Sequence, residues 1–323
     1  MNENYLNKKH MSSLSELTTS AKFEKAKQES FDFFYDIDDT NWDLLKEIFL
    51  KHENHKFPEK PLTHNPSYDK RKMSYFNSEQ AWYQSNYEPN FSCQFEKRIG
   101  WNMNGDGPKW ICDPHRIKYL AMKKKKQNPN HPGCVIYSIG SNGDFSFELG
   151  MQKELGVGTC EYHIFDMGDY ESKMPKELER GHYHQWGLTK QTTFESTSAL
   201  QKGQKFYGLR DTIRLLGHEK LEQIDVFKID CEKCEWKTFQ DWFGKGIPLL
   251  HQIQVEVHGA PGQKALDFFD TLEKEGYLRF HKEPNIQFDP KCVEYAFIKV
   301  DKKFMEGRNF TNIGIPESGI SHK

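Results

Sequence analysis

A strand-like run that ends in a glycine turn limits the folds open to this sequence. Residues 135–139 are mostly β-branched or aromatic, the turn carries Gly140 and Gly143, and the residues after it are able to start a helix. Glycine suits such a turn because it adopts positive φ and lets the backbone come close to a ligand. This order is the first unit of a doubly wound sheet, in which a nucleotide-like ligand lies beyond the carboxyl end of the strand. The segment lacks the G-x-G-x-x-G fingerprint, so an ordinary tight turn remains the alternative.

Three further strand-like segments follow at distances that suit such a sheet. Residues 162–166 end in Asp166, roughly 20 residues beyond the glycines, where a carboxylate accepts hydrogen bonds from a ribose diol. Residues 224–232 and 253–258 are rich in apolar residues and carry charged ones toward their ends. Because parallel strands bring their carboxyl ends to one edge, we expect all four segments to present polar side chains there.

Polar residues at the ends of the third and fourth segments are the candidates for chemistry. Side chains alternate along a strand, so Lys228, Asp230 and Glu232 point the same way. Glu256 and His258 likewise share one face of the next strand. A central strand of a doubly wound sheet is apolar on both faces, so these polar residues need partners or a function. A structural ion pair between Lys228 and Glu256 is the alternative.

Neither a metal site nor a disulfide framework is expected. The four carboxylate and imidazole groups just named are ligand types that a divalent cation accepts, but no spacing among them requires a metal. The seven cysteines are an odd number in a long chain, which suits free thiols in a reducing compartment. Cys231 and Cys234 form a C-x-x-C motif without a second pair at zinc-ribbon spacing, so we expect two core or helix-start thiols there.

The overall charge gives no reason to expect a nucleic-acid partner. The formal net charge is -2 at pH 7 and the isoelectric point is near 6.7, whereas nucleic acids favour clustered basic surfaces. Residues 1–20 are polar and lack the apolar segment of a signal peptide or a membrane span. These features predict a cytoplasmic protein, and nothing in the sequence indicates an oligomeric state.

Several motifs occur in the order found in a known family. They read YSIGSNGDFSFE from residue 137, HIFDMGD from 163, HQWGL from 184, IDVFKIDCEKCEW from 224 and QIQVEVHG from 252. Together with DGPKWICDPH at 106–115, they resemble the FkbM-type methyltransferases, and more closely a eukaryotic branch related to methyltransferase-like protein 24. The resemblance spans about residues 98–300.

The resemblance implies S-adenosyl-L-methionine as the cofactor and a Rossmann-like α/β fold. It implies a mostly parallel seven-stranded sheet with helices on both faces and a closing antiparallel hairpin, which residues 277–280 and 292–300 fit. Many such enzymes end the first strand with an acid that holds the cofactor's ammonium, whereas this chain has Ser138, and Glu148 or Asp144 can take that place. The cofactor-binding residues implied by the motifs are Ser138, Gly140, Ser141, Asn142, Gly143, Glu148, Asp166, Met167, Gly187 and Asp230.

Methyl transfer from a sulfonium is an in-line displacement, for which a protein supplies positioning, desolvation and, for a hydroxyl nucleophile, a base. We expect Asp230 near the methyl group and Glu256 or His258 as the proton acceptor. Lys228 is expected to keep the neighbouring carboxylates ionised. The reference pKa of His258 is near neutrality, which suits a base, although a lone histidine at a strand end can equally be structural. The family implies a hydroxyl acceptor on a small molecule or glycan.

Two other functions share part of this pattern. An NAD-dependent oxidoreductase uses the same strand and turn but needs the missing glycine fingerprint. A non-catalytic relative that only binds a ligand is compatible with Ser138. The resemblance also leaves the secretory pathway open as an alternative to the cytoplasm, because members of that branch often look membrane-anchored.

The composition divides the chain into five expected segments. Asp113 followed by Pro114 predicts a helix start with Asp113 as N-cap, and we expect the block around it to cover the cofactor edge. The segments are a disordered tail (1–20), a helical and irregular extension (21–92), a cap segment (93–130), a methyltransferase domain (131–302) and a C-terminal tail (303–323).

Overall fold

A computed structural model describes residues 22–55, 83, 86–100, 107–190, 204–259, 263–285 and 292–307. The chain divides into two compact units, of which the smaller joins Met1–Lys56 to Val300–Asn309 and the larger comprises Phe57–Lys299 and Phe310–Lys323. The expected N-terminal tail, residues 1–20, lies outside the described residues. Of the expected C-terminal tail, 303–323, residues 303–307 belong to the smaller unit and residues 308–323 lie outside the described residues.

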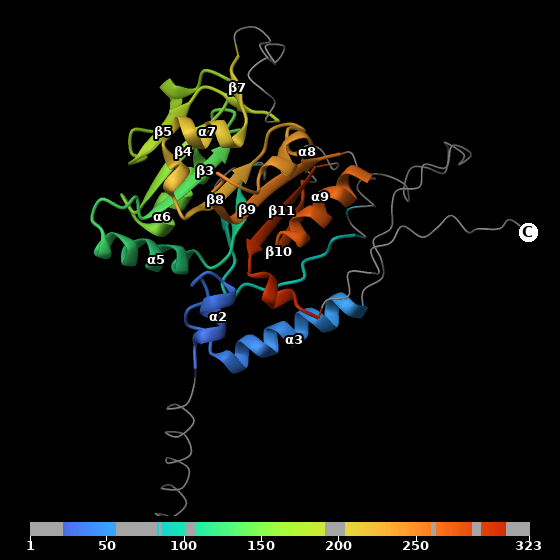
Figure 1. Ribbon diagram of the computed structural model, residues 1–323. Helices are drawn as coiled ribbons and strands as arrows, with labels where there is room; N and C mark the ends of the chain where they lie inside the picture. Colours follow the sequence, from blue (N-terminus) through green and yellow to red (C-terminus); the bar gives the residue numbers. More distant parts are fainter. Residues whose placement is uncertain are drawn as a thin grey trace, which may run out of the picture. The chain divides into compact units, whose positions relative to one another are not determined.

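The larger unit is built on a sheet that has seven strands in its described part (Figure 1). These are β3 (Cys134–Ile139), β4 (Cys160–Phe165), β5 (Gly181–His184), β8 (Gln223–Ile229), β9 (Leu249–His258), β10 (Tyr277–Pro284) and β11 (Cys292–Lys299). Their order is β10-β11-β9-β8-β3-β4-β5, and the strands from β9 to β5 are parallel. β11 pairs antiparallel with both β9 and β10, which forms the closing hairpin. The predicted Rossmann-like topology is confirmed.

Helices cover both faces of this sheet (Figure 1). They are α5 (Pro114–Gln127), α6 (Ser146–Leu155), α7 (Leu209–Leu215), α8 (Glu235–Thr238) and α9 (Gln263–Lys274). α5 contacts β3 and α6, and α6 contacts β4. On the other face, Leu209 of α7, Trp236 of α8 and Phe268 of α9 join one hydrophobic cluster with Tyr137 and Phe227. Burying each such large side chain contributes roughly 1.5–3 kcal/mol, so this cluster is the main core of the unit.

The opposite face of the central strands is polar. Ser138 of β3, Lys228 of β8 and Gln254 of β9 stand in register across three neighbouring strands, and all three side chains are buried. Alternate side chains point to opposite faces of a strand, so this polar row lies behind the hydrophobic cluster. Central parallel strands are normally apolar on both faces. A buried polar row in this position therefore points to a site.

A short antiparallel pair lies against the polar face. It consists of β1 (Lys97–Ile99) and β2 (Lys109–Ile111), and β2 contacts β9 and β11. The side chain of Gln252 in β9 holds the residue that follows β2. Its Oε1 accepts the Cys112 N–H at 2.9 Å and its Nε2 donates to the Cys112 carbonyl at 2.8 Å. These two bonds fix the segment before α5 against β9.

α5 begins at Pro114 with Asp113 at its N-cap position, as predicted, but the Asp113 side chain does not cap the helix. The backbone of Asp113 is left-handed, with φ of 42°, and its side chain makes no capping hydrogen bond. The carboxylate instead accepts the Phe95 N–H at 2.6 Å and pairs with Arg116 Nε at 3.0 Å. Both side chains of this ion pair are fully buried. A buried charge needs a partner, so the Asp113 carboxylate pairs with Arg116 and does not bond to the N–H groups of the first helical turn.

The smaller unit has an aromatic core of its own. It contains α2 (Glu24–Glu29), α3 (Asp39–His55) and the short 3₁₀-helix η5 (Lys302–Met305). The Trp42 ring lies 5.5 Å from the Phe34 ring and 4.9 Å from the Phe304 ring, and its Nε1 donates to Glu29 Oε2 at 2.8 Å. Segments from the two ends of the chain therefore complete one folded unit.

The cysteines are mostly paired, which corrects the expectation of free thiols. Cys134 and Cys160 face each other in register on β3 and β4. Such a pairing depends on strand register, which cysteine spacing and count do not reveal. The disulfides are Cys93–Cys112, Cys134–Cys160 and Cys231–Cys234, and Cys292 is buried outside these three pairs.

Candidate active site

The turn after β3 draws three strand ends together. Gly140 adopts a φ of 79°, its N–H donates to the Phe165 carbonyl at 2.8 Å, and its carbonyl accepts from Lys228 Nζ at 2.6 Å. A Cβ at Gly140 would lie 1.6 Å from the Asp230 carbonyl oxygen. Position 140 therefore requires glycine because the backbone at Asp230 packs directly against it, whether or not a ligand also binds at this turn.

Asp166 directly follows β4 and lies beside this turn. Its carboxylate accepts the Asn142 N–H and the Gly168 N–H, both at 2.8 Å. Each carboxylate oxygen has more than one lone pair, so capacity for a further hydrogen bond remains. The turn is also closed from within, because Ser141 Oγ accepts the Gly143 N–H at 3.3 Å. The glycine turn at 140–143 and Asp166 thus lie side by side at the carboxyl ends of β3 and β4, which we call the rim. The side chain of the adjacent Met167 is exposed.

Buried polar groups behind the turn lack hydrogen-bond partners among the described residues. They include Ser138 Oγ, both carboxylate oxygens of Glu148, and the amide of Gln254 farther along the polar row. Glu148 lies in the first turn of α6. Burial raises the pKa of its carboxyl, while the charge of Lys228 and the neighbouring Ser138 hydroxyl act in the opposite direction. An unpaired buried polar group costs about 1–3 kcal/mol, so Ser138 and Glu148 fit a bound polar group such as an ammonium.

Lys109 of β2 brings a buried ammonium group to the polar face. Its Nζ lies 3.3 Å from Asp230 Oδ2 and also pairs with Glu294 of β11. Burial alone would lower the pKa of Lys109, but the carboxylates of Glu294, Asp230 and Glu256 raise it above its ordinary value. Oxygens of these three acids lie within 4.8 Å of one another. The lysine supplies the positive charge that such a group of acids otherwise draws from a metal ion.

Asp230 and Glu256 differ in their affinity for a proton. Burial would raise the pKa of Asp230, but Lys109 and Lys228 lower it to about 2. Burial, Glu294 and Asp230 raise the pKa of Glu256 to about 9. The two groups interact closely, so they titrate as a pair. The neighbouring charges therefore favour the ionised form of Asp230 and the protonated form of Glu256.

His258 lies at the end of β9 with a carboxylate behind its ring. Glu235 Oε1 accepts the His258 backbone N–H at 3.0 Å and lies 3.1 Å from its Nδ1. Nε2 lies 3.7 Å from oxygens of Asp230 and Glu232 and 3.8 Å from Glu256. Burial lowers the pKa of His258, but Glu235 above all raises it, and the result is about 9. The ring is therefore an imidazolium at neutral pH and must lose a proton before it can act as a base.

The structure replaces the alternative ion pair between Lys228 and Glu256 with another contact. Lys228 Nζ donates to the Gly140 carbonyl at 2.6 Å. The predicted alternation along the third strand also ends early, since β8 ends at Ile229 and Glu232 has a φ of 52°. Glu232 therefore belongs to the following turn, with 83% of its side chain exposed.

Gly187 lies on the other face of the sheet from Ser138. It starts β6 (Gly187–Leu188) and lines a small, mostly apolar hollow with Tyr137, Phe165 and Trp186. A Cβ at Gly187 would lie 2.7 Å from the Phe206 ring, so packing accounts for this glycine. The structure does not bring Gly187 together with the unpartnered groups at Ser138 and Glu148.

The sequence comparisons agree with this geometry. A family model described as "Methyltransferase domain" matches residues 24–299, which is most of the chain. The chain belongs to the methyltransferase-domain family. The human "Probable methyltransferase-like protein 24" is 26% identical over 152 residues, which cover 46% of this chain and 37% of that protein. The rat protein of the same name is 26% identical over 153 residues, covering 47% and 38%. The chain thus matches less than two thirds of the length of these relatives. The family resemblance indicated by the motifs is confirmed.

Three charged residues of this methyltransferase-domain site were not selected from the sequence. Lys109 lies in the DGPKWICDPH block, Glu235 begins α8, and Glu294 lies on β11 directly opposite Glu256. A charged residue in an otherwise apolar strand was the available signal for Glu294. Lys109 and Glu235 reach the cluster only through tertiary packing.

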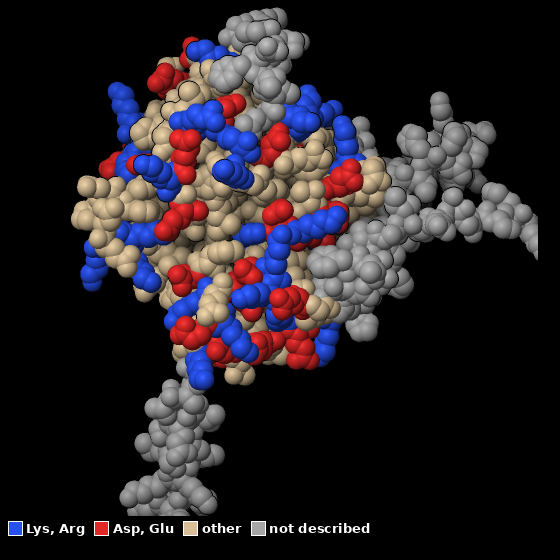
Figure 2. All heavy atoms as spheres, in the orientation of Figure 1, with Lys and Arg blue, Asp and Glu red and all other residues tan. Residues whose placement is uncertain are grey.

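The visible surface of this methyltransferase-domain protein carries both signs of charge. Figure 2 shows lysine and arginine side chains interspersed with aspartate and glutamate over the larger unit. In the described part of the chain, every helix is too short or too polar to cross a lipid bilayer.

Proposed function

We propose that the larger unit binds S-adenosyl-L-methionine at the rim formed by β3, β4 and β8 and methylates a hydroxyl group. The observation that carries this proposal is the pair of unpartnered buried groups, Ser138 and Glu148, behind a glycine turn bordered by Asp166. Membership in the methyltransferase-domain family supports it. When bound, the cofactor supplies a methyl group on a sulfonium, which a nucleophile displaces in line.

Each rim residue has a distinct part in cofactor binding under this proposal. Glu148, assisted by Ser138, holds the ammonium group, which supplies the partner that the buried carboxylate lacks. Asp166 accepts hydrogen bonds from the ribose hydroxyls with its remaining lone pairs. Gly140, Ser141, Asn142 and Gly143 form the turn under the nucleoside, and Met167 offers apolar surface beside it.

The charged cluster handles the proton of the acceptor hydroxyl. Asp230, ionised at neutral pH, orients the hydroxyl by accepting its hydrogen bond. Glu256 or His258 then takes the proton, which requires that this group first release its own. Lys109 pairs with the Asp230 carboxylate, while Lys228 donates to the Gly140 carbonyl and holds the turn beside it. The acceptor itself is a small molecule or glycan in this proposal, which rests on the family resemblance and on a formal net charge of -2 that gives no reason to expect nucleic acid.

A transfer assay tests the proposal. Tag-free protein is incubated with methyl-labelled cofactor and fractions of an extract from its own source, and labelled products are identified. We expect label in a product methylated at a hydroxyl oxygen, and a loss of at least about 100-fold in Asp230→Asn, as for removal of a group that positions the nucleophile. Asp267→Asn, on the exposed side of α9, is the matched control and keeps activity. Equal rates in the two variants would overturn the part given to Asp230.

A non-catalytic binding protein is the second candidate, favoured by Ser138 at a position where many relatives carry an acid. In that case Asp230→Asn leaves ligand affinity intact and no fraction gains label. An NAD-dependent oxidoreductase has less support, since the turn lacks the dinucleotide fingerprint.

The cysteine pairs bear on the compartment in which the protein works. Three disulfides are typical of an oxidising compartment and uncommon in the cytosol. We therefore propose the secretory pathway in place of the cytoplasm.

A further inference from the structure

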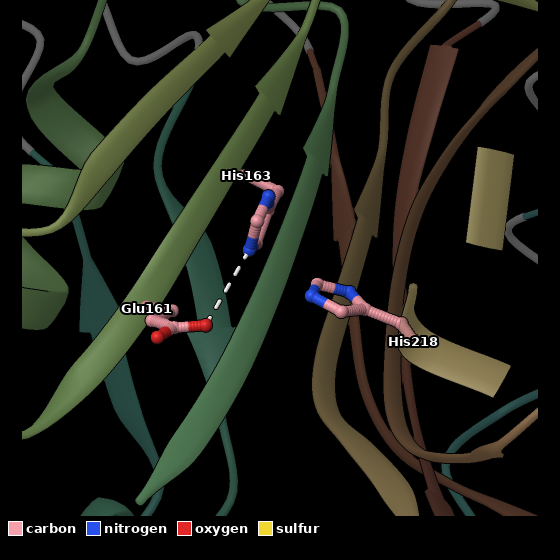
Figure 3. A group of neighbouring side chains, drawn as sticks. All are labelled: Glu161, His163 and His218. Atoms are coloured by element: carbon pink, nitrogen blue, oxygen red, sulfur yellow. Dashed lines mark ion pairs between the residues drawn. The ribbon is translucent and has the colours of Figure 1, made fainter. Parts of the chain in front are cut away.

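A group of histidines with one glutamate lies on the face of the sheet opposite the charged cluster. Glu161 and His163 project from the same face of β4, and His218 lies in the 3₁₀-helix η3 (His218–Lys220) that follows α7. Figure 3 shows the three side chains converging from these two elements. One ligand atom from each lies within 4.8 Å of the other two. This spacing suits three groups that share one metal ion.

The outer nitrogen of each imidazole already has a partner. His163 Nδ1 lies 3.0 Å from His184 Nε2, and His218 Nδ1 lies 2.7 Å from the Tyr137 hydroxyl. Metal-binding histidines typically donate their second N–H to such a partner, which fixes the tautomer and turns the other nitrogen toward the metal. The two contacts therefore leave Nε2 of each ring available as a ligand.

His163 Nε2 is a buried atom that has no hydrogen-bond partner among the described residues. The His163 side chain is 6% exposed. Its nearest acid, Glu161 Oε2, lies 3.8 Å away, which is beyond hydrogen-bond distance. Because buried polar atoms are normally paired, the vacant lone pair points to a ligand between the two groups.

The local charges suit a cation. Arg180 binds Glu161 Oε1, which leaves Oε2 facing His163. Arg180 weakens the attraction for a cation, while the ionised Glu161 provides it.

We propose that Glu161, His163 and His218 bind a divalent transition-metal ion, with zinc as the best fit. Two imidazoles and a carboxylate match zinc, cobalt or nickel better than magnesium or calcium, which prefer all-oxygen sites. The ion joins β4 to the segment after α7. Glu161 precedes Asp166 by five residues, roughly 16 Å along a strand. The site is therefore separate from the proposed cofactor rim.

Direct metal binding tests the proposal. Tag-free protein is treated with a chelator, dialysed, and titrated with zinc chloride in a calorimeter, and bound metal is measured by mass spectrometry. Cobalt substitution adds a visible absorption band that reports coordination by protein ligands. We expect about one ion per chain, as for a three-ligand site with a fourth open position. A chain that binds neither zinc nor cobalt would overturn the proposal.

Single variants locate the ion. His163→Gln, His218→Gln and Glu161→Gln each weaken zinc binding by at least about tenfold, since even outer-shell changes cost 10–100-fold. Glu161 and His218 are only half-buried, so their variants remain informative where His163→Gln fails to fold. His115→Gln, exposed on α5, is the matched control. Unchanged binding in the ligand variants would place the ion elsewhere and contradict the assignment. Binding of S-adenosylhomocysteine stays unchanged in these variants, which separates this inference from the proposed function.

Discussion

At the scale of single residues, the chemistry of the charged cluster depends on which groups keep a proton. Asp230 faces two buried lysines, which lower its pKa. Glu256 faces two other acids, which raise its pKa. His258 is held as a cation by Glu235. The base that a hydroxyl acceptor requires is therefore protonated at neutral pH.

The pH dependence of turnover follows from this state. Since Glu256 or His258 must lose a proton of pKa about 9 before it can act as a base, kcat/KM rises from pH 7 toward pH 9, about tenfold per pH unit. His258→Gln shows whether the histidine is that base, because the rise then disappears, and His115→Gln serves as control. A profile that is flat or falls over this range would contradict the assignment.

Stability moves in the opposite direction. The folded-state pKa of His258 is raised from 6.5 to about 9, so its contribution to stability is complete below the unfolded pKa and is lost as pH rises through about 9. The pH range that favours turnover is therefore the range in which the fold loses this support.

At the scale of elements, the rim depends on contacts between the ends of neighbouring strands. The Asp230 carbonyl oxygen occupies the space that a Cβ at Gly140 would need. The Asp230 N–H donates to the Ile139 carbonyl at 3.0 Å, which extends the pairing of β8 with β3. The turn after β3 and the end of β8 consequently form one rigid piece.

Gly140→Ala tests this rigidity. The substitution combines a left-handed φ of 79° with a clash at 1.6 Å against backbone, so we expect a loss above about 3 kcal/mol, more than backbone strain alone costs. Gly217→Ala is a matched control, because its φ is 71° and nothing lies within 4 Å of the added Cβ. That control loses only about 1–2 kcal/mol. Denaturant unfolding measures both, and equal losses would show that the contact with β8 is unimportant.

The elements themselves were largely predictable from the sequence. Apolar periodicity located the strands that end near Gly140, Asp166 and His258. The partners of Asp113 and Lys109 were not predictable, because a buried ion pair depends on which segments tertiary packing brings together. The helix start at Asp113 was therefore predicted correctly, whereas the partner of its side chain was not. The roles of the rim residues in cofactor binding stay predictions.

At the scale of the whole molecule, disulfide pairing distinguishes this chain from a protein with free thiols. The sequence contains seven cysteines, and six of them are joined in three pairs. One pair lies in the segment before α5, one joins β3 to β4, and one closes the turn after β8. Their connectivity depends on strand register and chain path, which composition does not show.

Thiol counting tests the pairing. Protein from an oxidising compartment is denatured and alkylated without reductant, then analysed by mass spectrometry. We expect one modified residue, Cys292, and seven after reduction. Seven modified cysteines without reduction would contradict the pairing and restore the cytoplasmic expectation.

Calorimetric titration with S-adenosylhomocysteine tests the proposed cofactor site most directly, with NAD in parallel and a thermal melt to confirm folding of each variant. We predict that the wild type binds S-adenosylhomocysteine and not NAD. Glu148→Gln should bind at least about tenfold more weakly, the value of a hydrogen bond to a charged group. Glu154→Gln, on the same helix with its side chain at the surface, should bind like the wild type. Binding of NAD instead, or equal affinity in Glu148→Gln and the wild type, would contradict the account.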